Sequence, residues 1–185
     1  MEDNIVMESV KSRLLFSGLK ELDKHGVADF SLRRVAQDAG VSCAAPYRHF
    51  KDKDELIGAV IDFVLEGWTL LAEQISGIFA DDTRALVTEL AVAGLRFWIG
   101  NGNFRTVIVA SATLGKGEKG TLSSFDEPII SAIEKYAEGM ENNTAQHISF
   151  KILSMLYGAI MLVDGGFEGA DKAADGLRRA IISEL

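Results

Sequence analysis

The sequence predicts an all-α protein, because three features of its 185 residues agree. Apolar residues recur at three- and four-residue steps along most of the chain, whereas the regular alternation typical of strands is scarce. Only two prolines, Pro46 and Pro128, interrupt the chain, which leaves room for long helices. Apolar residues make up 48% of the composition, so the chain can build a core and is not expected to be disordered.

The first third of the chain predicts a small head of three helices. The first helix is expected over residues 7–24, and Gly26 suits a left-handed stop after it. The second helix is expected over residues 32–39, with Ser31 as its N-cap, and it ends at a glycine. A short third helix then begins at Ser42 and tolerates Pro46 in its first turn. Residues 32–50 thus form a candidate helix-turn-helix, the unit that lays a helix into the major groove of DNA.

A long fourth helix is predicted from Lys53 to about Ile75. Asp52 can cap this helix, and Glu55 stands three residues later as the reciprocal partner of a capping box. The first turns of the helix belong to the head and its last turns to the rest of the chain. We therefore expect a DNA-binding domain over residues 1–55, joined by this helix to a larger helical domain over residues 56–185.

The larger domain is predicted to consist of helices separated by polar, glycine-rich breaks. Between residues 115 and 124 we expect a loop. The predicted helices cover residues 83–99, 104–114, 126–138, 144–163 and 170–185. The apolar pattern of residues 104–114 also fits a strand, but the helical context favours a helix.

Charge is unevenly distributed along the chain. The formal net charge is −8, which taken alone argues against binding to nucleic acid. Between Ser31 and Lys53, however, the sequence holds five basic and two acidic residues, a net charge of +3. The remaining residues therefore carry a net charge of −11. A locally basic segment on an acidic body is compatible with a DNA-binding head, although clusters of surface charge are common.

The cysteine content and the absence of long apolar runs predict a soluble, cytoplasmic protein that does not contact a membrane. Cys43 is the only cysteine, so an intramolecular disulfide is impossible. The acidic N-terminus does not resemble a signal peptide, and the most apolar run, residues 152–163, is shorter than the ~20 residues of a membrane span. A thiol at a helix N-terminus can sense redox conditions, but a small residue packed near DNA is the interpretation we favour for Cys43.

Catalytic and cofactor-binding motifs are weak in this sequence. Residues 115–120 spell G-x-G-x-x-G, but a dinucleotide site also needs a preceding strand and a helix that opens directly on the motif. We expect no immediate helix over residues 121–125, so a surface loop is the favoured interpretation. The three histidines are isolated, and no Ser/His/Asp set can be assembled. We therefore expect no catalytic residue, no metal, no cofactor and no enzymatic activity.

A family resemblance rests on the stretch FSLRRVAQDAGVSCAAPYRHFKDKDEL, residues 30–56. A Ser precedes the second helix, Gly-Val-Ser stands at residues 40–42, and aromatic–x–His–Phe follows at residues 47–50. With Lys53 and Leu56, this pattern resembles the N-terminal signature of the TetR family of bacterial transcription regulators. The resemblance covers about residues 9–62.

The resemblance implies a set of DNA contacts. Tyr47 and Lys53 would bind phosphates, while Arg33, Arg48 and His49 would touch the backbone or base edges. Ser31 stands at the N-terminus of the second helix, a type of position that can bind phosphate. The positions that face bases in the family hold Ser42, Cys43, Ala44 and Ala45. Three of these four lack a strong hydrogen-bonding side chain, so thymine methyl groups, backbone groups and DNA shape would contribute to recognition.

The resemblance also implies partners for the rest of the chain. It implies a homodimer through the last two helices, residues 145–163 and 170–182, and a small apolar effector bound in the body. The expected pocket residues are Trp68, Phe97, Trp98, Phe104 and Tyr157. The function so implied is that of a repressor which binds a pseudo-palindromic operator on double-stranded DNA and is released by the effector. The alternatives are a small α-helical enzyme and a protein-interaction module with an incidental helical hairpin.

Overall fold

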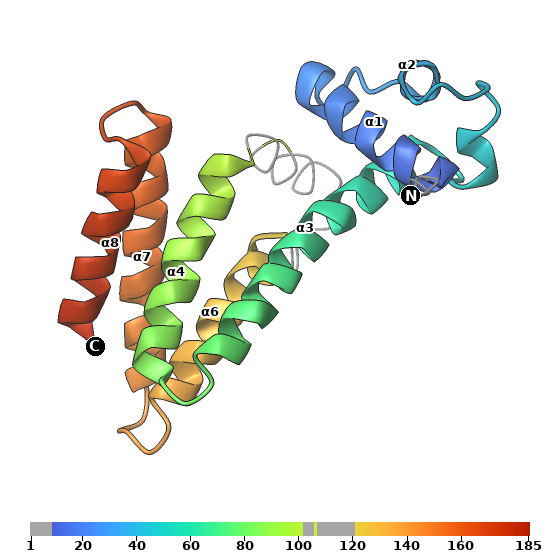
Figure 1. Ribbon diagram of the computed structural model, residues 1–185. Coiled ribbons are helices and arrows are strands. Elements are labelled where there is room, and N and C mark those ends of the chain that lie inside the picture. Colours follow the sequence, from blue (N-terminus) through green and yellow to red (C-terminus); the bar gives the residue numbers. More distant parts are fainter. Residues whose placement is uncertain (1–8, 102–105, 107–120) are drawn as a thin grey trace, which may run out of the picture. The chain divides into compact units, whose positions relative to one another are not determined.

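The computed structural model describes residues 9–101, 106 and 121–185, and the regular elements of this part of the chain are all helices (Figure 1). The predicted all-α class is confirmed. The elements are α1 (Val10–His25), α2 (Leu32–Asp38), the 3₁₀ helix η1 (Pro46–Arg48), α3 (Lys53–Ile78), α4 (Thr83–Gly100), α6 (Thr121–Tyr136), α7 (Thr144–Asp164) and α8 (Ala170–Glu184). The predicted helix over residues 104–114 lies outside the described residues, apart from Thr106, which is helical.

The described residues form two compact units. The head unit comprises residues 9–64 and Thr106, and the body unit comprises residues 65–101 and 121–185. The boundary between the first two stretches falls inside α3, so this helix supplies residues to both units.

Local hydrogen bonds define the ends of the head helices. The hydroxyl of Ser9 accepts a hydrogen bond from the amide of Ser12 at 3.1 Å and caps the start of α1. At the other end Gly26 has φ +67° and donates its amide to the carbonyl of Leu22 at 2.8 Å. Gly26 ends α1 as predicted, but its ψ of −176° places it outside the αL region that was expected. Glycine adopts this positive φ without the steric cost that a Cβ would bring.

The predicted cap of α3 is confirmed, with one change of partner. The carboxylate of Asp52 accepts from the amide of Glu55 at 2.9 Å. The carboxylate of Glu55 reaches back to the amide of Lys51 at 2.5 Å, one residue before the cap. Two amide donors at this helix start are therefore satisfied by side chains, which fixes the entry into α3.

Close packing of α1 on α3 depends on Gly18. A Cβ at this position would stand 2.9 Å from Cγ2 of Val60, a stiff branched side chain on α3. We expect Gly18→Ala to lower the free energy of unfolding by about 1 kcal/mol, although alanine is the better helix former. Gly67→Ala on α3, where no atom lies within 4 Å of the added Cβ, is the control and should raise it by about 0.5–1 kcal/mol. Urea titrations of both variants measure the two values, and a gain for Gly18→Ala would contradict the close approach.

In the body unit α4 packs against α6, α7 and α8 (Figure 1). The centre of the core is Trp68, which is fully buried, and its indole nitrogen donates to the carbonyl of Phe125 on α6 at 2.9 Å. The ring of Phe125, also fully buried, lies 4.9 Å from that of Trp68. This contact ties the C-terminal part of α3 to α6.

The start of α6 differs from the prediction. We expected a loop over residues 115–124 and a helix from Asp126. The shared boundary is wrong, because α6 already begins at Thr121. Pro128 therefore lies inside this longer helix, where it forfeits the hydrogen bond to the carbonyl of residue 124. The G-x-G-x-x-G residues lie outside the described part of the chain, but a helix does follow them directly. The parallel strand that a dinucleotide site requires does not occur in residues 121–185, which form three helices.

The apolar run at residues 152–163 lies within α7, which agrees with the helix predicted over residues 144–163 and is longer than the run itself. α7 has 21 residues with a mean hydropathy of 1.3 over 18 of them, so by length and composition alone it could cross a membrane. Only 28% of that stretch is buried within this chain. The helix also carries Lys151, whose ammonium is paired with Glu184 on α8 at 2.6 Å.

Candidate functional site

The predicted third helix of the head is not an α-helix. Residues 42–45 form a turn in which the amide of Ala45 donates to the carbonyl of Ser42 at 2.8 Å, and Pro46–Arg48 continues it as a 3₁₀ helix. The prediction of a helix capped by the Ser42 side chain was therefore wrong. The physical reason is Pro46, which has no amide to donate to the carbonyl of Ser42, so the i→i+4 ladder cannot start across these residues.

The short segment still presents an exposed polar surface. Pro46 and Phe50 are buried in the head and anchor the segment at both ends. Between them the side chains of Tyr47, Arg48 and His49 are exposed, and Tyr47 has 63% of its surface accessible. Of the four residues predicted to face bases, Ser42, Cys43 and Ala44 are exposed and Ala45 is partly exposed. The structure thus brings the predicted contact residues of this segment onto the surface together.

The N-terminus of α2 is held in place by a carboxylate of α1. Glu21 is buried, and its oxygen accepts from the amide of Ser31 at 3.1 Å and from Nε of Arg34 at 2.7 Å. The Ser31 hydroxyl in turn accepts from the Arg34 amide at 3.4 Å, which confirms it as the N-cap. The hydrogen bond to Glu21 raises the pKa of Arg34. Arg34 is therefore engaged by Glu21 within the head, although both Arg34 and the neighbouring Arg33 are exposed.

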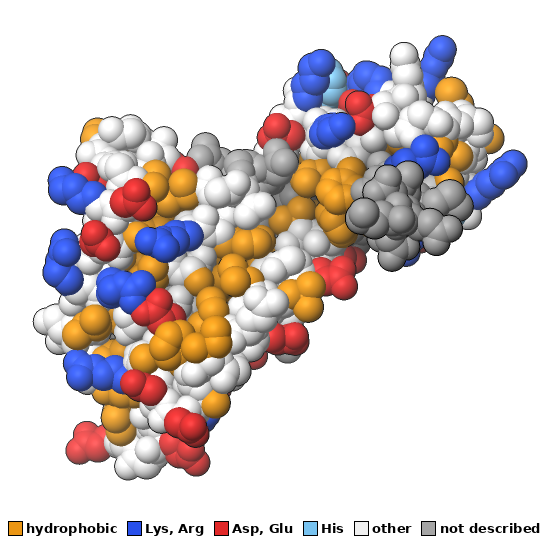
Figure 2. All heavy atoms as spheres, viewed as in Figure 1, with side chains coloured by type: hydrophobic (Ala, Val, Ile, Leu, Met, Phe, Trp, Pro, Cys, Tyr) orange, Lys and Arg blue, Asp and Glu red, His pale blue; other side chains and the backbone are white. Residues whose placement is uncertain are grey.

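Lys53 lies at the start of α3 and is partly exposed. Its ammonium is 3.4 Å from the carbonyl of Val27, in the connection between α1 and α2. An ammonium has three donors, so this long contact leaves two of them for a phosphate oxygen. Figure 2 also shows separate Lys and Arg side chains scattered over the head.

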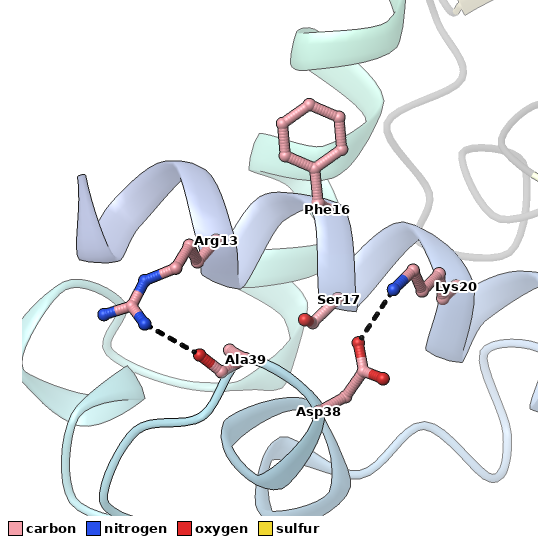
Figure 3. A pocket seen from close by; sticks show the side chains of 6 residues that line it. All are labelled: Arg13, Phe16, Ser17, Lys20, Asp38 and Ala39. Carbon is pink, nitrogen blue, oxygen red and sulfur yellow. Dashed lines mark hydrogen bonds and ion pairs between the residues drawn. The ribbon is translucent and has the colours of Figure 1, made fainter. Parts of the chain in front are cut away.

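A hollow of about 350 Å³ lies between α1 and α2 (Figure 3). The guanidinium of Arg13 donates to the carbonyl of Ala39 at 3.2 Å, and Lys20 pairs with Asp38 at 3.3 Å. A hydrogen bond from Ser17, helped by Lys20, lowers the pKa of Asp38. Phe16 points away from these groups, and its ring lies 5.1 Å from that of Phe63 on α3. These contacts tie the C-terminal end of α2 to α1, so both ends of α2 are fixed by side chains of α1.

The predicted pocket residues of the body unit gather around one aromatic cluster, but they differ in exposure. Trp68 is fully buried, whereas Phe97, Trp98 and Tyr157 are partly exposed. The rings are connected, with Trp68 5.5 Å from Phe97 and Trp98 6.1 Å from Tyr157. Phe104, the fifth predicted residue, lies outside the described residues.

Comparison with known proteins identifies the N-terminal domain. Residues 14–60 match the family described as "Bacterial regulatory proteins, tetR family". This part of the chain is a tetR family domain. The matched residues include all of α2, the turn and η1, so they contain most of the contact surface described above.

Relatives agree with this assignment. An HTH-type transcriptional regulator from Staphylococcus aureus is 33% identical over 71 residues, and the match spans 38% of this chain and 38% of that regulator. A transcriptional regulator from Aquifex aeolicus VF5 has a similar structure, with a TM-score of 0.70 at 21% identity over 96% of this chain and 100% of that one. The regulator FadR from Bacillus subtilis, solved in complex with stearoyl-CoA, gives a TM-score of 0.69 at 10% identity over 94% and 98% of the two chains. At these identities the two structures show the fold alone, which this chain shares with them along nearly its whole length.

Two polar residues were not singled out by the sequence reasoning. Glu21 carried a usable signal, because it lies at a helical step from Leu14 and Gly18 and so falls on the buried face of α1. A carboxylate on a core face is expected to have a buried partner. Asp126, whose carboxylate bonds Tyr157 on α7, carried no such signal, since its partner is 31 residues away in the sequence.

Proposed function

We propose that this chain is a cytoplasmic tetR family transcriptional regulator that binds double-stranded operator DNA through its head unit. The observation that carries the proposal is the exposed surface of Tyr47, Arg48 and His49 on a segment anchored by buried residues at both ends. Arg33 adds a cation near the N-terminus of α2, where backbone amides favour a phosphate. The charged groups supply affinity, while the small residues Cys43 and Ala44 allow close approach to the groove.

The proposed active form is a homodimer that uses α7 and α8. Large apolar side chains are exposed on these helices and on the loop that joins them. They are Phe150 at 75%, Met161 at 73%, Leu162 at 50%, Phe167 at 81% and Ile182 at 46% of their surface. Apolar groups at this density on a soluble protein indicate an interaction surface. A two-fold dimer would place two heads on the two halves of a pseudo-palindromic operator.

Regulation is proposed to follow from a small molecule bound in the body unit. FadR from Bacillus subtilis was solved with stearoyl-CoA, and it shares the fold of this chain. Here Phe97, Trp98 and Tyr157 are the candidate lining residues, while Trp68 supports them from the core. The ligand would act as an inducer that releases this chain, a repressor, from its operator. It would do so by binding more tightly to a conformation of the chain that does not fit the operator. α3 is the element proposed to carry the change, because it supplies residues to both units.

The phosphate contacts are tested by two substitutions in the head. Tyr47→Phe removes one hydroxyl donor and should weaken operator binding by about fivefold, which corresponds to roughly 1 kcal/mol. Lys53→Ala removes a phosphate-neutralising charge and should lower the slope of log affinity against log salt by about 1. Gel shifts with DNA from upstream of the protein's own gene, at several salt concentrations, measure both quantities.

Lys172→Ala is the matched control, because it removes the same charge from an exposed position on α8. Its affinity and salt slope should equal those of the unchanged protein, and light scattering should show the same oligomer for all variants. Equal affinities for Lys53→Ala and Lys172→Ala would remove the phosphate-contact assignment. A specific, salt-sensitive complex also separates the proposal from the helical-enzyme and protein-interaction alternatives, since neither predicts one.

A further inference from the structure

Asp126 is a carboxylate held partly out of water on α6. The hydroxyl of Tyr157 on α7 donates a hydrogen bond to it at 2.7 Å. Burial raises the pKa of Asp126, and the hydrogen bond from Tyr157 only partly offsets this. No Lys or Arg within the described ranges forms an ion pair with it. The charge of this carboxylate is therefore partly desolvated, and no cation among the described residues compensates it.

Five aromatic rings form a connected cluster that includes Tyr157, the hydrogen-bond partner of this carboxylate. We call Trp68, Phe97, Trp98, Phe125 and Tyr157 the aromatic cluster. The ring of Trp98 meets that of Tyr157 edge-on at 6.1 Å and that of Phe125, the residue before Asp126, at 5.8 Å. The cluster draws on α3, α4, α6 and α7, so four helices fix its shape.

The cluster has a buried base and an accessible rim. Trp68 and Phe125 are fully buried. Phe97, Trp98 and Tyr157 are partly exposed, as is Asp126 itself. The carboxylate and its partner Tyr157 thus belong to the accessible part of the cluster.

Keeping a desolvated carboxylate beside aromatic rings has an energetic cost. A buried charge is normally paired, and replacing Asp126 with asparagine would keep an oxygen acceptor for Tyr157 while removing that cost. Burial, together with the hydrogen bond to Asp126, raises the pKa of Tyr157, so its hydroxyl remains a neutral donor and cannot neutralise the carboxylate. A charge retained at such a position indicates a binding role.

We propose that Asp126 and the aromatic cluster form the recognition site for a lipophilic organic cation. The carboxylate supplies the opposite charge, and the electron-rich faces of Trp98 and Tyr157 attract a cation that has little hydration to lose. A neutral apolar ligand would leave the carboxylate uncompensated, and an anion would be repelled by it. The inference rests on the proposed function to this extent: the cation would be the small molecule that regulates the chain.

The test compares two probes of one shape and opposite charge, tetraphenylphosphonium and tetraphenylborate. Isothermal titration of the full chain should give an affinity for the phosphonium at least about tenfold higher than for the borate. Asp126→Asn should weaken phosphonium binding by about tenfold or more and leave borate binding unchanged or stronger. Equal affinities for the two probes would overturn the proposal.

Glu127→Gln is the matched control for Asp126→Asn. Glu127 is the next residue on α6, it is exposed, and its substitution changes the net charge by the same amount. Phosphonium affinity should stay within about twofold in this variant, because an exposed charge is screened by water and salt. If Asp126→Asn and Glu127→Gln weaken binding equally, the cation responds to the overall acidity of the body and the site is refuted.

Folding is checked by thermal unfolding, where Asp126→Asn should melt no lower than the unchanged protein. Trp98→Leu provides a second variant that retains apolar volume but removes a ring face, and it should weaken phosphonium binding by about three- to fivefold with a smaller effect on borate. An equal loss for both probes in this variant would reduce the role of Trp98 to packing and contradict the cation site.

DNA binding is measured separately, without either probe. A chain that binds operator DNA but shows no preference for the phosphonium overturns the cation site and leaves the regulator proposal standing. A chain that binds the phosphonium through Asp126 but forms no specific DNA complex overturns the regulator proposal alone.

Discussion

Replacing Trp68 with alanine is expected to destabilise the body unit by about 3–5 kcal/mol, the loss typical of a large aromatic side chain deleted from a core. Trp68 is fully buried, and it packs on Phe125 at 4.9 Å and on Phe97 at 5.5 Å. Its removal also leaves the carbonyl of Phe125 without the indole donor that bonds it at 2.9 Å. Urea unfolding followed by circular dichroism measures the change in free energy.

Trp68→Phe separates the contribution of packing from that of the indole hydrogen bond. The phenyl ring retains most of the packing but has no N–H donor, so a loss of about 1–2 kcal/mol is expected. Leu70→Ala is the surface control on the same helix, with 55% of its side chain exposed, and it should change stability by less than about 0.5 kcal/mol. A loss below about 1 kcal/mol for Trp68→Ala would contradict the central position of this residue in the core.

Replacing Glu21 with alanine is expected to lower the stability of the head unit by about 2 kcal/mol. It should also weaken DNA binding, although Glu21 is not one of the proposed DNA contacts. The carboxylate is buried, and it accepts from the Ser31 amide at 3.1 Å and from Arg34 Nε at 2.7 Å. Without it the start of α2 loses its tie to α1 and two donors lose their partner. Hydrogen exchange of the α2 amides should become faster, and gel shifts should show weaker binding.

Two variants distinguish positioning from charge. Glu21→Gln keeps an oxygen acceptor for Ser31 and Arg34, so it should retain more stability and more DNA affinity than Glu21→Ala. Lys24→Ala changes an exposed residue one turn away on α1 and should alter neither quantity by much. Faster exchange confined to other parts of the head in Glu21→Ala, with α2 unchanged, would refute the positioning role.

The sequence predicted most helices of this fold because their signals are local. Ser31, Asp52 and Gly26 act at helix ends through bonds to residues three or four positions away, and such bonds follow from sequence spacing. The start of α6 was missed because Gly, Ser and Thr near residues 115–124 are typical of a loop. The third head helix was wrong because a single missing amide, that of Pro46, decides between an α-helix and a 3₁₀ helix in so short a segment.

The candidate site was predictable to a lesser degree. Exposure of Tyr47, Arg48 and His49 follows from their position between two buried anchors, and the family motif points to the same residues. The roles of Glu21 and Asp126 depend on partners from other helices, Arg34 on α2 and Tyr157 on α7. Which side chains meet across helices is set by tertiary packing, and a single sequence does not specify it residue by residue.

The measurement that tests the central claim most directly is selection of binding sites from a random double-stranded DNA library by the full chain. A regulator of this kind should enrich a pseudo-palindromic site whose half-sites are separated by about one helical turn, or a multiple of it. The selected site should bind at least about a thousandfold more tightly than random DNA at physiological salt. A library that shows no enriched sequence after several rounds, with protein that is folded throughout, would contradict sequence-specific DNA recognition by this chain.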